Sequence, residues 1–83
     1  MKKSIHTRDY EVFRRQLREA RERAGITQVE LAAKLETTQS FVSKVELGDS
    51  RLDVIQLRAI LDAIGVRLAD FIDQLEKELN REP

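Results

Sequence analysis

The chain has 83 residues, and its 15 Lys and Arg balance its 15 Asp and Glu, so that its formal net charge is zero. This length supports one domain with a small core, and 41% hydrophobic with 36% charged residues is typical of a soluble globular chain. The absence of cysteine excludes disulfides and thiolate metal sites. No apolar run approaches the ~18 residues of a membrane span, so we expect a cytoplasmic protein without a membrane segment.

The charges are unevenly distributed along the chain. Residues 1–51 carry 11 Lys and Arg against eight Asp and Glu, whereas residues 52–83 carry four against seven. Proteins that bind DNA are usually basic, so the zero total argues against nucleic acid while the basic first half favours it. We therefore expect any DNA to meet the first half, with a moderate affinity per protomer that depends on dimerisation.

The first eight residues have no periodic apolar pattern. We expect a flexible N-terminal tail over residues 1–8, followed by a single domain over residues 9–83. The one histidine of the chain, His6, lies in this tail. A lone histidine in such a segment is expected to be inert rather than a ligand.

A first helix is predicted from about Arg8 or Asp9 to Ala24. Asp9 is expected to act as its N-cap, or at least to favour the positive end of the helix dipole. The exposed side alternates in sign, and we expect its arginines, Arg14, Arg15 and Arg18, to be solvated. The buried stripe recurs at spacings of three and four and consists of Tyr10, Phe13, Leu17, Ala20 and Ala24.

Two short helices joined by a tight turn are predicted over residues 27–48. Thr27 is an N-cap with Glu30 three residues later, which is the spacing of a capping box, and Thr38 caps the next helix. Gly48 follows the last helical residue, where a left-handed backbone favours glycine. Two such helices with a turn of three or four residues form a helix-turn-helix. Their expected buried residues are Leu31, Ala32, Leu35, Val42 and Val45.

The second of these helices, predicted at about residues 38–47, carries a polar face opposite its two valines. Gln and Lys side chains can read base edges in the major groove, and Ser can contact either bases or phosphates. Taken alone, these residues leave a solvated surface and a DNA-reading surface equally open. The polar face consists of Gln39, Ser40, Ser43 and Lys44.

The sequence around this unit resembles the phage-repressor-like helix-turn-helix family of Cro/C1 or XRE type. The matching residues are Gly25, Ile26, Thr27, Gln28, Leu31, Ala32 and Leu35, then Thr38 to Glu46, and Gly48. The resemblance extends from about residue 10 to residue 72. It implies an all-α fold, a compact five-helix lambda-repressor-like domain whose helix-turn-helix is formed by helices 2 and 3. It also implies a dimer that binds operator DNA and regulates transcription.

The resemblance also implies roles for individual residues. Gln28 matches a glutamine that holds a phosphate and braces Gln39, while Arg21 and Glu46 match positions that form an ion pair between the first and third helices. We expect Thr38, at the start of the recognition helix, and Ser43, on its polar face, to lie against the DNA as well. The positions that match base-contacting residues are Gln39, Ser40 and Lys44.

Two positions depart from the family. Glu36 stands in the turn where glycine is usual, and it must take a positive φ, at a cost on the order of 1–2 kcal/mol, if the turn keeps its geometry. Leu47 stands where polar residues are common, which weakens the expectation of a phosphate contact there. Phe41 is expected to brace the recognition helix rather than to contact a thymine methyl group.

A loop and a fourth helix follow the recognition helix. Arg51 and the backbone amides of residues 48–51 are expected to lie along the DNA backbone. Asp53 is the predicted N-cap of the fourth helix, with Gln56 completing a capping box. The expected buried stripe of this helix is Val54, Leu57, Ile60, Leu61 and Ile64.

A fifth helix is predicted over about residues 68–79. Leu68 and Phe71 are expected to close the core of the domain. The remaining apolar residues continue a heptad-like seam. Because a protruding apolar stripe is costly in water, we favour a dimer interface there over cover for the chain's own core. The dimerisation residues predicted in this way are Ile72, Leu75 and Leu79.

The sequence therefore favours a DNA-binding transcriptional regulator, acting as a repressor, that binds a palindromic operator as a homodimer. Two alternatives stay open, an antitoxin-like protein and a protein-interaction module, each with its C-terminal helix bound to another protein. We expect neither an enzyme nor a bound cofactor or metal. The chain has no glycine-rich phosphate loop and no histidine–carboxylate cluster at metal-binding spacing.

Overall fold

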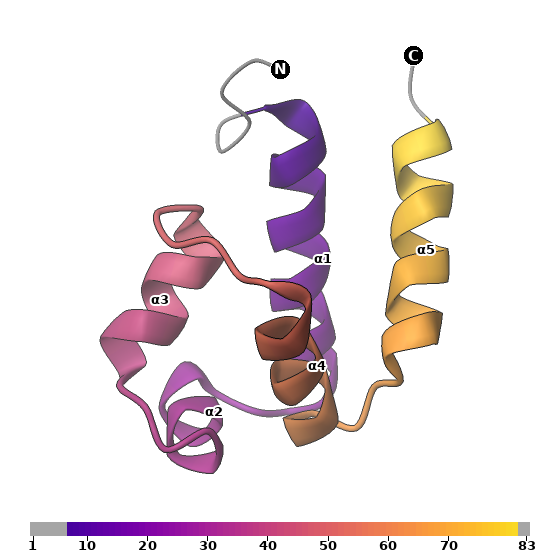
Figure 1. The fold of residues 1–83 in the computed structure, drawn as a ribbon. Coiled ribbons are helices and arrows are strands. Elements are labelled where there is room, and N and C mark those ends of the chain that lie inside the picture. The colour runs from indigo at the N-terminus through magenta and orange to yellow at the C-terminus, as the bar shows by residue number, and fades with distance from the viewer. Residues whose placement is uncertain (1–6, 82–83) are drawn as a thin grey trace.

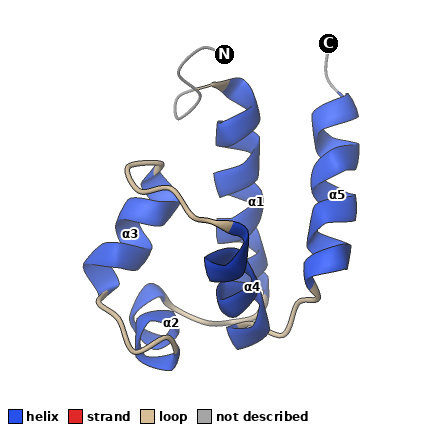
Figure 2. Cartoon of the chain, viewed as in Figure 1, coloured by secondary structure: helices blue, strands red, loops and turns tan. Residues whose placement is uncertain are grey.

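The computed structural model describes residues 7–81, and five α-helices account for most of them (Figures 1 and 2). Residues 1–6 and 82–83 lie outside the described part, and with them lies the expectation for His6. The predicted all-α fold, with its helix-turn-helix formed by the second and third helices, is confirmed. The helices are α1 Arg8–Arg23, α2 Gln28–Lys34, α3 Gln39–Leu47, α4 Val54–Ala63 and α5 Leu68–Arg81.

The long first helix, α1, is the element around which the others are arranged. It contacts α3 on one side and α5 on the other, while α2 packs against α3 and α4 (Figure 1). Since α1 has neighbours on two sides, its buried surface is wider than a single stripe. Within residues 7–81, no helix is both long and apolar enough to span a membrane.

Local side-chain contacts fix where the helices begin. The Thr7 hydroxyl accepts a hydrogen bond from the amide of Tyr10 and caps α1, so the expected Asp9 cap is wrong. The other role expected of Asp9 is confirmed, because it lies in the first turn, where its charge suits the positive end of the helix. Thr7, which is expected in the tail, therefore caps the first helix, and the helix begins at Arg8, one of its two predicted first residues.

The other predicted caps are confirmed. The amide of Thr27 donates to Glu30 Oε1 at 2.8 Å and the amide of Glu30 donates to the Thr27 hydroxyl at 3.1 Å, which completes the capping box of α2. Asp53 and Gln56 form the same reciprocal pair at the start of α4. These contacts satisfy backbone N–H groups that have no partner inside a helix.

A single core joins all five helices; two residues expected in it, Val54 and Ala24, are exposed, and one buried residue, Val12, is not among those predicted. Val54, predicted to be buried, is 57% exposed because it is the first residue of α4 and lies at the edge of the packed region. Ala24 is exposed because α1 ends before it, whereas Val12 is buried on the side of α1 that faces α5. The core consists of Leu17, Ala20, Leu31, Ala32, Val42, Val45, Leu57, Ile60, Leu61, Ile64 and Phe71.

Candidate nucleic-acid interface

The recognition helix, α3, has one buried side and one exposed side. Val42 and Val45 are buried at 3% and 2% exposure, and they hold the helix against the core. The Thr38 hydroxyl accepts a hydrogen bond from the amide of Phe41 at 3.1 Å and caps the helix. On the opposite side Gln39, Ser40 and Lys44 are exposed, while Ser43 is half-buried.

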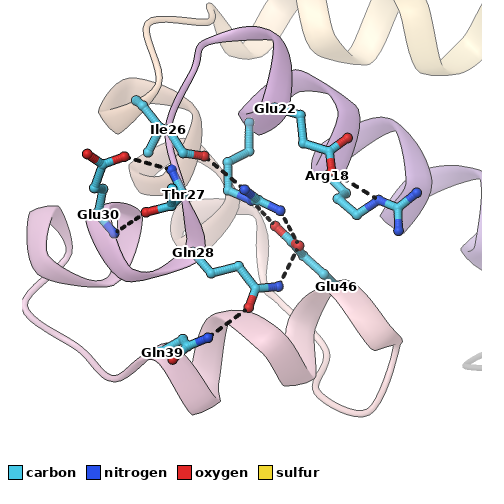
Figure 3. Close-up of polar contacts among 9 residues, drawn as sticks. Arg18, Glu22, Ile26, Thr27, Gln28, Glu30, Gln39 and Glu46 are labelled. Carbon is cyan, nitrogen blue, oxygen red and sulfur yellow. Dashed lines mark hydrogen bonds and ion pairs between the residues drawn. The ribbon is translucent and has the colours of Figure 1, made fainter.

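Two glutamines connect the exposed side of α3 to the interior. Gln39 Nε2 donates to Gln28 Oε1 at 3.3 Å, and Gln28 Nε2 donates to Glu46 Oε1 at 2.9 Å (Figure 3). Because a carboxylate can only accept, Glu46 fixes which way the Gln28 amide faces. Gln28 must then present its oxygen to Gln39, which braces that side chain as the family resemblance implies.

The predicted ion pair between Arg21 and Glu46 is present and buried. Arg21 Nε and Nη2 donate to the two carboxylate oxygens of Glu46 at 2.6 and 2.9 Å, and the side chains are 9% and 5% exposed. Arg21 Nη1 also donates to the carbonyl of Ile26 at 2.8 Å. The hydrogen bond to Glu46 raises the pKa of Arg21 against the opposing effect of burial, so Arg21 stays charged.

These contacts form one polar chain that runs from α1 to the exposed face of α3. It passes from Arg21 to Glu46, then to Gln28 on α2, and ends at Gln39. Every link is a hydrogen bond, and the buried end is the ion pair of Arg21 with Glu46. A bidentate arginine–carboxylate pair has a defined geometry, so the outward glutamine is anchored through a rigid interior pair.

Arg14, which is expected to be solvated, instead belongs to this region. Its Nη1 donates to the backbone carbonyl of Glu46 at 3.2 Å, so the expectation of a solvated side chain is wrong. Arg15 and Arg18 are exposed, as predicted. Arg14 precedes Arg21 by seven residues, or about two helical turns, which places both on the same side of α1. The seven-residue spacing from Arg21 is therefore the sequence feature that indicates a partly buried contact for Arg14.

The turn between α2 and α3 contains the backbone conformation expected from the resemblance. Glu36 has φ 56°, and in the described residues it is the one non-glycine residue with a positive φ. The amide of Thr37, which follows it, donates to the carbonyl of Ala32 at 2.9 Å and closes the end of α2. The helix-turn-helix geometry is therefore kept without the usual glycine, at a steric cost.

The segment after α3 lies against the N-terminal half of α1. The Tyr10 hydroxyl donates to the carbonyl of Ser50 at 3.4 Å, and the Arg51 guanidinium carbon lies 5.3 Å from the centre of the Tyr10 ring. Arg51 is exposed at the end of this segment. Leu47 is 62% exposed, and Phe41 is half-buried against the core.

Metal-binding groups do not gather in the part of the chain that the structure describes. Between residues 7 and 81, no cluster of three or more His, Cys, Asp or Glu side chains could hold a metal ion. The side chains that do converge there are those around Glu46, which donate hydrogen bonds to it (Figure 3).

Two short helices, a fixed turn and an outward polar helix face define a helix-turn-helix domain. The family model described as Helix-turn-helix matches residues 17–71. The chain therefore belongs to the helix-turn-helix family, in its XRE-type branch, and is a DNA-binding regulator domain.

The comparison with solved structures agrees with this assignment. An XRE-family like protein from Pseudomonas syringae pv. tomato str. DC3000 is 44% identical to this chain and superposes with a TM-score of 0.82. The match covers 90% of this chain and 92% of that one. Comparison with the curated proteins finds no significant match.

Proposed function

We propose that this protein is a sequence-specific transcriptional repressor that binds a palindromic operator as a homodimer. The observation that carries the proposal is the exposed Gln39, which is hydrogen-bonded through Gln28 to the buried Glu46. A side chain held before binding loses less conformational freedom when it binds, so this glutamine is prepared for a specific contact. A regulator of this kind works in the cytoplasm, where it has access to the promoter that it occludes.

We assign base reading to the exposed side of α3. A glutamine reads adenine through its amide, and a lysine favours guanine, so Gln39 and Lys44 are the proposed base readers. Ser40 is proposed to contact a base edge beside them. Phosphate contacts, which position the protein without reading sequence, are assigned to Gln28, Thr38, Ser43 and Arg51.

Selection of bound duplexes from random DNA by the purified protein tests this function. We expect inverted repeats whose half-sites lie roughly 34 Å apart along the DNA. Replacing Gln39 by alanine should cost about 1–3 kcal/mol at one base position of each half-site and relax the preference there. Gln74→Ala, at an exposed glutamine on α5, is the matched control and should leave the preference unchanged. No enriched sequence, or an equal loss on every sequence, would contradict the proposal.

The homodimer proposal rests on apolar side chains that the folded chain leaves exposed. Ile72 on α5 is 43% exposed, and Val54 and Ile55 at the start of α4 are 57% and 70% exposed. Leu75 and Val54 line one shallow groove of about 390 Å³. A two-fold interface is self-complementary, and in the proposed dimer exposed aliphatic side chains of one protomer occupy this groove of the other. Leu79, also on α5, is half-buried and extends the proposed interface.

Sedimentation of the purified protein tests the dimer separately from DNA. The unsubstituted protein should sediment as a dimer, and Ile72→Glu should shift it to a monomer because a buried unpaired charge is costly. Glu76→Gln, an exposed polar change on the same helix, should leave the dimer intact. A monomer at every concentration would contradict the dimer.

The exposed aliphatic side chains of α4 and α5 also favour a second function. An antitoxin-like protein or a protein-interaction module would use the same surface to bind a different protein. The two functions are separated by the sedimentation result, because only the second expects the chain alone to be monomeric. DNA selection then separates an antitoxin-like regulator, which enriches an operator, from a module that binds protein alone.

A further inference from the structure

The side of α1 that faces the recognition helix carries two residues to which the proposed function gives no role. Tyr10 and Arg14 lie four residues apart, and so they lie on one side of the helix. Both make hydrogen bonds to backbone carbonyls at or after the end of α3. Neither is part of the polar chain that ends at Gln39, so they need a separate explanation.

Arg14 binds the end of the recognition helix. Its Nη1 donates to the carbonyl of Glu46 at 3.2 Å. The last carbonyls of a helix lack partners inside it and carry the negative end of its dipole, so a guanidinium suits this place. The Arg14 side chain also lies close to Gly48, where an added Cβ would be 3.1 Å from its Cδ and Nε. Arg14 and Gly48 therefore pack directly against each other.

Tyr10 binds the segment that follows. Its hydroxyl donates to the carbonyl of Ser50, and its ring lies against the Arg51 guanidinium. Burial raises the pKa of Tyr10 although the nearby Arg51 and Arg14 charges lower it, so the hydroxyl keeps its proton at neutral pH. The ring is itself held by Phe13, whose centroid is 5.4 Å away.

We propose that Tyr10 and Arg14 are positioning residues that hold the segment from Gly48 to Arg51 in place for a DNA phosphate. This inference rests on the proposed DNA binding and adds a role for α1 to it. Arginine loses much side-chain freedom when it binds a phosphate. The Tyr10 ring confines the Arg51 guanidinium before DNA arrives, and the two hydrogen bonds to backbone carbonyls fix the chain from which it projects.

Amide hydrogen exchange in the free protein tests the hold on this segment without DNA. The amides of Asp49 and Ser50 donate to the carbonyl of Lys44 at 2.8 and 3.2 Å, so their exchange reports how often the segment opens. Tyr10→Phe and Arg14→Gln should each speed exchange at these amides by roughly three- to tenfold, the effect of one lost hydrogen bond. Arg15→Gln removes the same charge from an exposed neighbour and should change nothing. Unchanged exchange in both variants would overturn the proposal.

Salt dependence of DNA binding tests the phosphate role. The affinity falls linearly with salt on a log–log plot, and each lost phosphate contact reduces the slope by about one. Tyr10→Leu, which removes the ring beside Arg51, should weaken binding to all sequences and reduce the slope. Tyr10→Phe keeps the ring beside Arg51 and loses only the hydroxyl bond, so it should reduce the slope less than Tyr10→Leu does. Sedimentation should show the same oligomeric state for all three proteins.

A double-substitution cycle shows whether Tyr10 acts through Arg51. Once Arg51 is replaced by alanine, Tyr10→Leu should cause no further loss of affinity, because the side chain that it positions is gone. Independent losses, or a slope that Tyr10→Leu leaves unchanged, would overturn the phosphate role. Absence of any DNA binding by the unsubstituted protein would overturn the proposed function and the phosphate role together. The exchange experiment alone would then decide whether Tyr10 and Arg14 hold the segment.

Discussion

The junction of α1 with α3 and the outer surface of α5 use charged side chains in opposite ways. At the junction, the side chains of Arg21 and Glu46 are almost fully buried, and Arg21 Nε lies 2.6 Å from Glu46 Oε2. On α5, Asp73 and Lys77 also form an ion pair, with Lys77 Nζ 3.3 Å from Asp73 Oδ2, but both side chains are 68% exposed. A buried pair must be satisfied completely, whereas a solvated pair adds little to stability.

This difference extends to the surroundings of each pair. The carboxylate of Glu46 accepts hydrogen bonds from Arg21 and Gln28, and its backbone carbonyl accepts one from Arg14. Both halves leave large aliphatic side chains in water, Val29 and Leu47 in the helix-turn-helix half and Val54, Ile55 and Ile72 in the C-terminal half. The difference between the halves is therefore the buried polar chain around Glu46, which joins α1, α2 and α3.

Of the substitutions that test this difference, removal of the buried Glu46 carboxylate should change the free energy of unfolding most. Glu46→Ala leaves the Arg21 guanidinium buried, with the carbonyl of Ile26 as its one remaining hydrogen-bond acceptor among residues 7–81. We expect the free energy of unfolding to fall by about 3–5 kcal/mol, measured by urea denaturation. A loss under ~0.5 kcal/mol would show that the pair is not desolvated in solution.

A matched double variant separates the orphaned charge from the loss of packing. Arg21→Met combined with Glu46→Leu replaces both charges with apolar side chains of similar size. Because neither partner is left alone, most of the stability lost in Glu46→Ala should return. Gln39 would then lose its brace, so DNA discrimination should stay impaired although the fold is restored.

The strained turn gives the next largest expected change. Glu36→Gly relieves the positive φ of 56° and should raise the free energy of unfolding by on the order of 1 kcal/mol. The gain should appear as a higher melting temperature. Glu36→Ala keeps the Cβ that causes the strain, so it serves as the control and should bring no such gain. A melting temperature that glycine lowers would contradict the left-handed conformation.

The capping box of α2 should make a smaller, pH-dependent contribution. Hydrogen bonds from Thr27 lower the pKa of Glu30, so its stabilising effect is present above the unfolded pKa. That effect is lost as the pH falls through the lower folded pKa. Glu30→Gln keeps an acceptor but cannot titrate. The stability advantage of the unsubstituted protein over this variant, measured by urea unfolding, should therefore shrink between about pH 7 and pH 3.

The smallest effect is expected on α5. Lys77→Ala breaks the exposed pair with Asp73 and replaces one good helix former by another. The free energy of unfolding should change by less than ~0.5 kcal/mol in thermal or urea denaturation. A change as large as that of Glu46→Ala would show that this surface is buried, as it would be inside a tight dimer.

Much of the fold follows from local patterns in the sequence. The apolar spacing, the Thr27–Glu30 and Asp53–Gln56 capping boxes and the glycine after α3 depend only on residues within a few positions of one another. The contact between Arg21 and Glu46 joins residues 25 positions apart, and only the family resemblance predicts it.

The features that the sequence analysis missed depend on how helices cross. The charge of Arg14 suggests solvent, and only the approach of α3 to α1 brings the carbonyl of Glu46 within its reach. Val12 is buried because α5 covers a second side of α1, which no periodicity in α1 itself can reveal. Val54 is exposed because the core ends at the first turn of α4. The DNA contacts themselves depend on a partner that is not part of the chain.

Glu46 ties three helices together through one side chain and one carbonyl, and it does so on the side of α3 away from Ser40 and Lys44. In the proposed function, the residues that support this helix are therefore separate from those that read bases. If that function holds, exchanging Ser40 and Lys44 while Glu46 is left in place should change the operator preference and keep the fold. Gln39 is the exception, because any replacement there must also suit the oxygen of Gln28.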